Sequence, residues 1–215
     1  MKFTAKNITT IGMLSAMALA VNLLISFPMV PAVAFLKYDP KDIVIVMGGF
    51  IFGPMSALVM SVICSVLEIL FRGGTIIDVM MNVFSTGMFA CTAAFLYKKN
   101  HSRRGAVMGL LLGTLLSTGS MLLWNYIITP IYFSIPRSEV VKLLLPGILP
   151  FNLLKNGLNA CITFVFYKGV VKTLRKANLI ESNRHETELN VGLILFALFI
   201  GASMVGIILA MQQVI

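Results

Sequence analysis

The sequence predicts an all-α integral membrane protein, because it is rich in long apolar runs and poor in charge. The chain has 215 residues, of which 58% are hydrophobic and only 12% are charged, and its mean hydropathy is +0.94. A soluble domain carries roughly 25% charged residues. Runs that provide the ~20 apolar residues of a membrane-spanning helix recur along the chain, which leaves little room for a soluble domain.

Seven apolar segments are predicted to form helices. The second is short and ends at Phe52-Gly-Pro54, and the last carries no charge. We expect Asp42 to cap the second helix. Asp78 is expected in the first turn of the fourth, where a carboxylate suits the positive end of the helix dipole. The predicted ranges are 8–27, 43–53, 55–70, 77–96, 105–129, 149–169 and 191–213, and the main outer loops are 28–41 and 130–147.

The first apolar run is predicted to be a retained helix. Lys2 and Lys6, followed by Ala18-Leu-Ala20, resemble a signal peptide with its cleavage site. The apolar run continues to Phe27, however, so cleavage would leave an apolar stub. Retention is therefore the better interpretation.

The distribution of Lys and Arg predicts the orientation in the membrane. With the N-terminus in the cytoplasm, 11 of the 17 Lys and Arg residues fall in inner segments, 5 fall in outer loops, and Lys155 lies inside a helix. Such a bias is typical of membrane proteins. We predict a multi-pass protein of the cell membrane with a cytoplasmic N-terminus and an extracellular C-terminus. Because the net charge of +9 arises from short loops, no nucleic-acid partner is expected.

Lys155 indicates a polar site within the sixth segment, where Asn152, Asn156 and Asn159 share its helical face. A cation in a membrane helix costs about 2.5–3.5 kcal/mol and usually faces a cavity or a partner. The alternative is that the Lys155 side chain merely extends to the outer interface, since it lies only about 9 Å deep. Other polar residues are predicted near the outer ends of their helices: Asn125, Glu68, Asp78 and Asn82. This pattern favours a cavity that opens outward over a channel.

Small residues recur every four positions in three segments, which is typical of close helix packing in membranes. For the fifth and seventh segments we expect packing within the bundle, and for the first a partner surface is an open alternative. The rows are Gly12, Ala16 and Ala20; Gly105, Gly109, Gly113 and Ser117; and Ala202, Gly206 and Ala210.

Several functional signatures are absent from the sequence. It contains no Gly-x-x-x-x-Gly-Lys-Ser/Thr loop, no His-Glu-x-x-His and no Gly-x-Ser-x-Gly. Its three Cys and two His residues lack the spacing of a disulfide framework or a metal site. We therefore predict neither an enzyme nor a bound metal or cofactor. A membrane enzyme that uses Lys155, Glu68 or Asp78, and a scaffold without a ligand, are the competing hypotheses.

Four stretches together carry a resemblance to a known family. They are Leu36-Lys-Tyr-Asp-Pro-Lys-Asp42, Gly49-Phe-Ile-Phe-Gly-Pro54, Trp124-Asn-Tyr with Pro130-Ile-Tyr132, and Gly147-Ile-Leu-Pro-Phe-Asn-Leu-Leu-Lys155. In this order they resemble the substrate-binding S component of energy-coupling factor (ECF) transporters, with most similarity to the riboflavin-specific branch. The resemblance covers about residues 8–172. An S component for a different vitamin or a nucleobase-like molecule is the alternative.

The resemblance implies a six-helix S-component bundle that binds one vitamin near the outer face of the lipid bilayer. Its partners would be a transmembrane coupling subunit and two ATPase subunits, and riboflavin would be a transported ligand. Residues 1–172 would form the substrate-binding membrane domain and residues 173–190 a charged cytoplasmic linker. Residues 191–215 would form an additional C-terminal transmembrane helix, which departs from the family pattern.

The resemblance also implies roles for individual residues. Asn125, Asn152 and Lys155 would bind the isoalloxazine edge, and Phe151, Leu36 and Trp124 would pack against the rings. Ala16 and Ala20 would contact the coupling subunit. The loop that covers the ligand would contain Leu36, Lys37, Tyr38 and Asp39, and Glu68 and Asn82 complete the predicted substrate-binding set.

Overall fold

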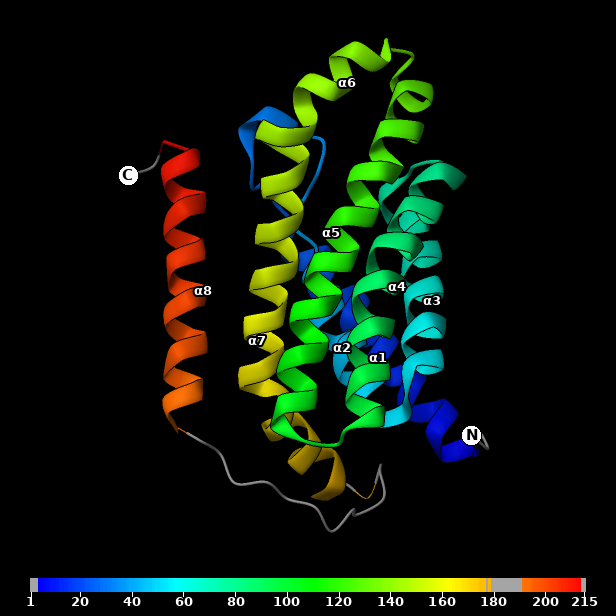
Figure 1. Cartoon of the computed structure of the whole chain (residues 1–215). Helices are drawn as coiled ribbons and strands as arrows, with labels where there is room; N and C mark the ends of the chain where they lie inside the picture. Colours follow the sequence, from blue (N-terminus) through cyan, green and yellow to red (C-terminus); the bar gives the residue numbers. More distant parts are fainter. Residues whose placement is uncertain (1–3, 177, 179–190, 214–215) are drawn as a thin grey trace.

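The protein is a bundle of long helices whose axes run roughly side by side (Figure 1). The computed structural model describes residues 4–176, 178 and 191–213. Among these residues there is no β-sheet, only an isolated bridge between Pro28 and Lys37. The α-helices are α1 (Ala5–Leu24), α2 (Lys41–Phe52), α3 (Pro54–Arg72), α4 (Ile76–Lys99), α5 (Arg103–Phe133), α6 (Arg137–Leu143), α7 (Leu149–Lys176) and α8 (Val191–Met211), with short turns η1 (Pro31–Val33) and η2 (Leu144–Ile148). The predicted all-α class is confirmed.

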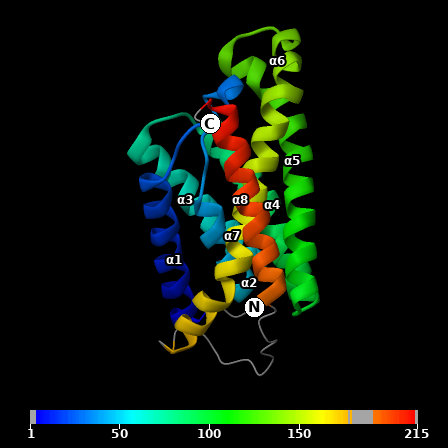
Figure 2. The same cartoon turned by 90° about the vertical axis from the view of Figure 1, so that its left-hand side faces the viewer.

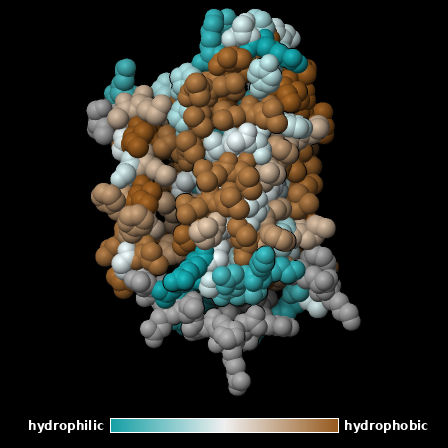
Figure 3. Space-filling view, viewed as in Figure 1, coloured by the Kyte–Doolittle hydropathy of each residue, from teal (hydrophilic) through white to brown (hydrophobic). Residues whose placement is uncertain are grey.

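The surface of the bundle fits a lipid environment. Five of the described helices, α1, α3, α4, α5 and α8, are long and apolar enough to cross a membrane. Figure 3 shows a broad hydrophobic band with hydrophilic side chains at both ends of the molecule. The 12 residues of α2 span only about 18 Å, which is less than the ~30 Å of a bilayer core. This helix therefore lies within the bundle without crossing the membrane.

Because α2 is short, the chain between α1 and α2 must enter the bundle to reach it. This segment, residues 25–40, runs down to α2 in Figure 2, and Tyr38, Asp39 and Pro40 at its end are buried. The prediction that Asp42 caps α2 is wrong. Pro40 occupies the cap position, while Asp42 lies in the first turn and accepts a hydrogen bond of 2.6 Å from Thr86 of α4.

The predicted ends of α5 and α7 differ most from the structure. The segment 130–147 is largely helical, because α5 continues through Pro130 to Phe133 and is followed by α6 and η2. A proline is tolerated inside a membrane helix when neighbouring groups satisfy the freed carbonyl, and α5 ends instead at Ser134, whose φ is 53°. Helix α7 also extends to Lys176, beyond the expected end near 169. The predicted position of Asp78 is confirmed, since it forms a capping box with Thr75.

The small residues of α5 pack inside the bundle, as expected. A Cβ on Gly109 would lie 2.7 Å from the carbonyl oxygen of Ala93 in α4, and one on Gly113 would lie 2.7 Å from that of Phe89. One turn further on, Ser117 donates a hydrogen bond of 3.1 Å to the Ser85 carbonyl. These three contacts bring the backbones of α4 and α5 together along much of their length.

The small residues of α8 do not face the bundle, so that packing prediction is wrong. Ala202 and Ala210 are exposed, and a Cβ on Gly206 would have no atom within 4 Å. The row of α1 also faces outward, since Gly12, Ala16 and Ala20 are exposed. The same four-residue spacing thus marks an internal contact in α5 and an outward face in α1 and α8.

Replacing Gly113 with Ala is expected to destabilise the bundle, because the new Cβ would meet the backbone of α4. Overpacking of this kind costs about 1–3 kcal/mol, so the melting temperature of the detergent-purified protein should fall. Gly119 of the same helix has no atom within 4 Å of the corresponding position. Gly119→Ala should therefore have no effect or raise the melting temperature, since Ala favours a helix over Gly. Equal effects of the two substitutions would contradict the close approach of α4 and α5.

Candidate ligand-binding site

A cavity of about 570 Å³ lies at the end of the bundle where α1, α3 and α5 end and where α4 and α7 begin. This volume is within the range of small-molecule sites. The wall is completed by the segment between α1 and α2. All nine residues predicted to bind the substrate line this cavity: Leu36, Lys37, Tyr38, Asp39, Glu68, Asn82, Asn125, Asn152 and Lys155.

Lys155 lies inside the protein. It is only 4% exposed, so the alternative that it extends to the membrane interface is wrong. Its ammonium group is 3.1 Å from the Asp42 carboxylate and 3.6 Å from that of Asp39. Since an ammonium group has three donor hydrogens, two acidic partners leave Lys155 able to donate to a ligand in the cavity.

The polar face of α7 also holds the loop that lines the cavity. The side chain of Asn159 accepts a hydrogen bond of 2.7 Å from the Tyr38 hydroxyl and donates one of 3.0 Å to the Asp39 carbonyl. Asn152 is anchored by a hydrogen bond to the Ile148 carbonyl. The four polar residues predicted to share this face are all buried, so the face points into the protein.

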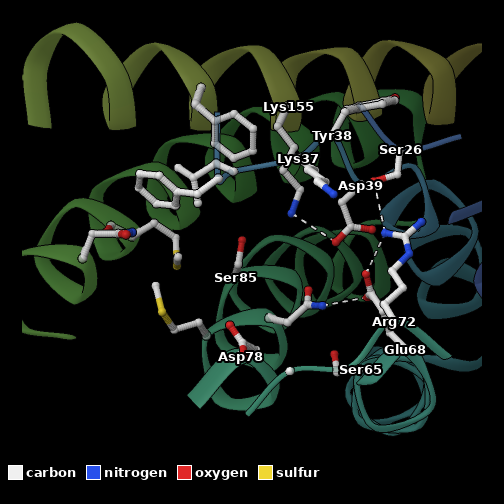
Figure 4. Close-up of a pocket in the computed structure, with 18 of the residues that line it drawn as sticks. Ser26, Lys37, Tyr38, Asp39, Ser65, Glu68, Arg72, Asp78, Ser85 and Lys155 are labelled. Carbon is white, nitrogen blue, oxygen red and sulfur yellow. Dashed lines mark hydrogen bonds and ion pairs between the residues drawn. The ribbon is translucent and has the colours of Figure 1, made fainter. Parts of the chain in front are cut away.

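A buried network of charges joins the loop to three helices. Lys41 is fully buried, and its ammonium group contacts the carboxylates of Asp39 and Glu68, the latter at 2.7 Å. Glu68 also accepts hydrogen bonds from Arg72 at 3.2 Å and from Asn82 at 2.9 Å. In Figure 4 the side chains of Asp39, Glu68 and Arg72 converge. Paired in this way, the charges avoid the cost of isolated burial.

In this network, one oxygen atom of the Asp39 carboxylate makes no hydrogen bond to the described residues. Burial alone would raise the pKa of the Asp39 carboxyl, but Lys41 and Lys155 outweigh burial and hold this pKa below its ordinary value. The group is therefore a carboxylate at neutral pH. Its Oδ1 atom has no hydrogen-bond partner among the described residues. Asp39 lines the cavity, but this oxygen atom itself is enclosed by protein.

Of two neighbouring predicted residues, Asn125 lines the cavity and Trp124 does not. Asn125 is fully buried, accepts a hydrogen bond of 3.0 Å from Thr129 and donates one to the Met121 carbonyl. Trp124 is not among the lining residues and stacks on Phe84, with 4.7 Å between ring centroids. The apolar part of the wall is instead formed by residues such as Phe35, Met121 and Phe151.

Sequence reasoning assigned no site role to Lys41 or Arg72, which are two of the five basic residues counted in the predicted outer loops. Arg72 joins α3 to the end of α1, since it donates to the Ser26 hydroxyl at 3.1 Å and to the Asn22 carbonyl. The spacing of four between Glu68 and Arg72 was a usable signal, because it places both on one helix face. Lys41 lies two residues after Asp39, but no spacing in the sequence marked its other partner, Glu68, which lies 27 residues further along the chain.

Replacing Lys41 with Met is expected to lower stability by about 3–5 kcal/mol, because it leaves buried carboxylates without their cation. Lys142 provides the matched control, since it pairs with Glu139 at 2.7 Å but both side chains are exposed. Exposed pairs contribute only about 0–1 kcal/mol, so Lys142→Met should be nearly neutral. Thermal unfolding of the detergent-purified variants measures both effects. A Lys41→Met variant as stable as Lys142→Met would mean that the buried network does not hold the site together.

Comparison with known proteins places this chain in a family. Residues 6–167 match the family model for the substrate-specific component of ECF transporters. The riboflavin transporter FmnP of Bacillus subtilis (strain 168) is 32% identical over 171 residues, which cover 75% of this chain and 88% of FmnP. The riboflavin transporter RibU of Streptococcus thermophilus is 30% identical over 179 residues, which cover 79% and 84% of the two chains.

Structural comparison agrees with the sequence comparison. A solved structure described as the S component of a bacterial ECF transporter matches with a TM-score of 0.67 and 28% identity, over 79% of this chain and 98% of that chain. The family match spans α1 to most of α7 and includes every predicted site residue. The protein therefore belongs to the family of substrate-specific components, or S components, of ECF transporters.

Proposed function

We propose that this S component captures riboflavin from outside the cell and passes it to a coupling subunit driven by two ATPase subunits. The observation that carries the proposal is the buried set of Asn125, Asn152 and Lys155 at one cavity. Two of the relatives that share this family are named riboflavin transporters. Because the family is one of transport components, the protein is not an enzyme.

The donors and acceptors of the cavity suit a flavin. The uracil-like edge of the isoalloxazine ring has carbonyl acceptors and one N–H donor. Amide side chains offer both donors and an acceptor, and the Lys155 ammonium offers donors only. Apolar side chains such as Leu36 and Phe151 supply contacts for the ring faces. The Asp39 side chain in the cavity wall supplies a carboxylate that suits a hydroxyl of the ribityl chain.

The distribution of basic residues supports an outward-facing cavity. Lys98 and Lys99 end α4, and Arg103 and Arg104 begin α5, which puts all four at the end of the bundle opposite the cavity. Such a cluster favours the cytoplasmic side. We infer a cytoplasmic N-terminus, and an extracellular C-terminus after α8, since α1 begins and α8 ends at opposite ends of the bundle (Figure 1).

The outward face of α1 suits a contact with the coupling subunit. Gly12, Ala16 and Ala20 are exposed, and a Cβ on Gly12 would have no atom within 4 Å. A row of small residues that packs on nothing within its own chain allows another helix to approach closely in the membrane. We infer that Ala16 and Ala20 lie at this contact.

Riboflavin binding is expected to depend on the polar face of α7. Purified protein from riboflavin-fed cells should be yellow, with quenched flavin fluorescence. Lys155→Ala and Asn152→Ala should each weaken binding by more than about 1 kcal/mol, because each leaves polar groups of the ligand unpaired. Leu153→Ala is the matched control, since Leu153 is 37% exposed on the other side of the same helix turn, and its affinity should equal that of the wild type.

Failure of this binding experiment would be informative. A colourless wild-type protein without affinity for added riboflavin would overturn the flavin assignment, and mass spectrometry of the co-purified ligand would then identify the alternative vitamin or nucleobase-like molecule. Wild-type affinity in both Lys155→Ala and Asn152→Ala would show that this face does not bind the ligand.

Substitutions in the outward row of α1 are expected to separate binding from transport. Ala16→Trp and Ala20→Trp should abolish riboflavin uptake by cells that express the coupling module, because a large side chain blocks the approach of another helix. Both variants should retain riboflavin binding in detergent. Ala202→Trp, at an exposed small residue of α8, controls for a bulky residue in the membrane and should leave uptake unchanged. Normal uptake by the α1 variants would mean that the row faces only lipid.

A further inference from the structure

Helix α8 lies outside the part of the chain that matches the family, residues 6–167, yet it packs on α7 through a defined face. Ala197 and Ile208 on this face are 8% and 4% exposed. Gly201 faces Cys161 of α7, with 3.7 Å between the Cys161 Cβ and the position of a Cβ on Gly201. On the α7 side, a Cβ on Gly157 would lie 2.5 Å from the end of Met204. Helix α8 therefore packs closely on α7 along this face.

The outer end of α8 also contacts the segment between α1 and α2. Ile208 belongs to the same buried apolar cluster as Met29, Val30 and Tyr38 of that segment, and Met204 and Met211 pack against this cluster. The Gln212 side chain, just after α8, donates a hydrogen bond to the Pro28 carbonyl. Both views of the molecule show the end of α8 beside η1 (Figures 1 and 2).

The same segment supplies part of the cavity wall. Residues 35–39 line the cavity, and the segment is held on its other side by α7 and η2. Asn159 binds Tyr38 and the Asp39 carbonyl, and Val33 packs closely against Gly147. Residues 28–39 are thus held between α7 with η2 on one side and α8 on the other.

We propose that Ile208 of α8 and Gln212 just after it are positioning residues for ligand binding, which hold residues 28–39 in the arrangement that closes the cavity. They touch no ligand themselves and act through Pro28 and the apolar residues of the segment. The proposal rests on the proposed capture of riboflavin. It assigns a role in binding to the helix in which this chain departs from the matched family region.

The physical reason lies in the composition of the segment. Met29, Val30 and Val33 are fully buried, and without α8 part of the cluster that buries them would be open to lipid or water. Loss of Gln212 would leave the Pro28 carbonyl without this donor. Loss of the α8 packing or of the Gln212 hydrogen bond would let residues 28–39 move away from the cavity. Leu36, Tyr38 and Asp39 would then lose their contacts with the ligand.

The test compares neighbouring residues of α8 in the full-length protein. Ile208 is 4% exposed, whereas Ile207 is 51% exposed, so Ile207→Ala is a matched control for Ile208→Ala. Riboflavin association and dissociation are measured by stopped-flow fluorescence quenching. Ile208→Ala and Gln212→Ala should each raise the dissociation rate, by about tenfold for Ile208→Ala, which corresponds to about 1.4 kcal/mol. Ile207→Ala should match the wild type, and Ile208→Val should restore most of the wild-type rate.

A cross-link tests the same contact by joining the end of α8 covalently to the segment. Pro28→Cys and Gln212→Cys are combined in a protein in which Cys64, Cys91 and Cys161 are replaced, and a short bis-thiol reagent joins the new cysteines. The link should slow riboflavin release relative to the same protein before cross-linking. Unchanged release from fully cross-linked protein would overturn the proposal.

The outcomes separate this inference from the proposed function. If the wild type does not bind riboflavin, the proposed function fails and the inference fails with it. If the wild type binds riboflavin but Ile208→Ala and Gln212→Ala release it as Ile207→Ala does, the positioning role of α8 is refuted while the proposed function stands.

Discussion

The buried network of charges around Asp39 is the constraint on which the arrangement of the cavity depends. An unpaired charge within a membrane protein is costly, so each charged side chain here requires a partner. The partners come from separate elements: Lys41 begins α2, Glu68 lies near the end of α3, and Lys155 lies two turns into α7. Satisfying all of them at once brings these helix ends together around the loop. The cavity is the space that remains between them.

The shortness of α2 explains why a loop can reach this depth. A helix of 12 residues cannot span the bilayer core, so the chain before it must descend into the bundle. The polar backbone of a buried loop has to be satisfied by protein. Tyr38 bonds to the Phe27 carbonyl, Asn159 of α7 bonds to the Asp39 carbonyl, and Gln212 bonds to the Pro28 carbonyl. The loop is therefore held by its own backbone and by helices from the other end of the chain.

The three rows of small residues illustrate how one sequence pattern serves different surfaces. In α5 the row allows the backbone of α4 to approach, and larger residues there would collide with carbonyl oxygens. In α1 and α8 the row points away from the bundle. For α8 the packed face is formed instead by Ala197, Gly201, Met204 and Ile208. The spacing shows that close approach is possible, and the neighbouring helices decide whether it occurs within the chain.

Composition and hydropathy by themselves determined the all-α membrane class, because lipid accepts only segments whose backbone is satisfied internally. The helical spacing of Asn152 and Lys155 and the order of the motifs also located the cavity and the family. The tertiary structure alone decided that Asp42 bonds to Thr86, that Lys41 joins Asp39 to Glu68, and that α8 reaches the loop. Apart from the contact of Lys41 with Asp39, these contacts join residues far apart in the chain, and local spacing carries no information about such partners.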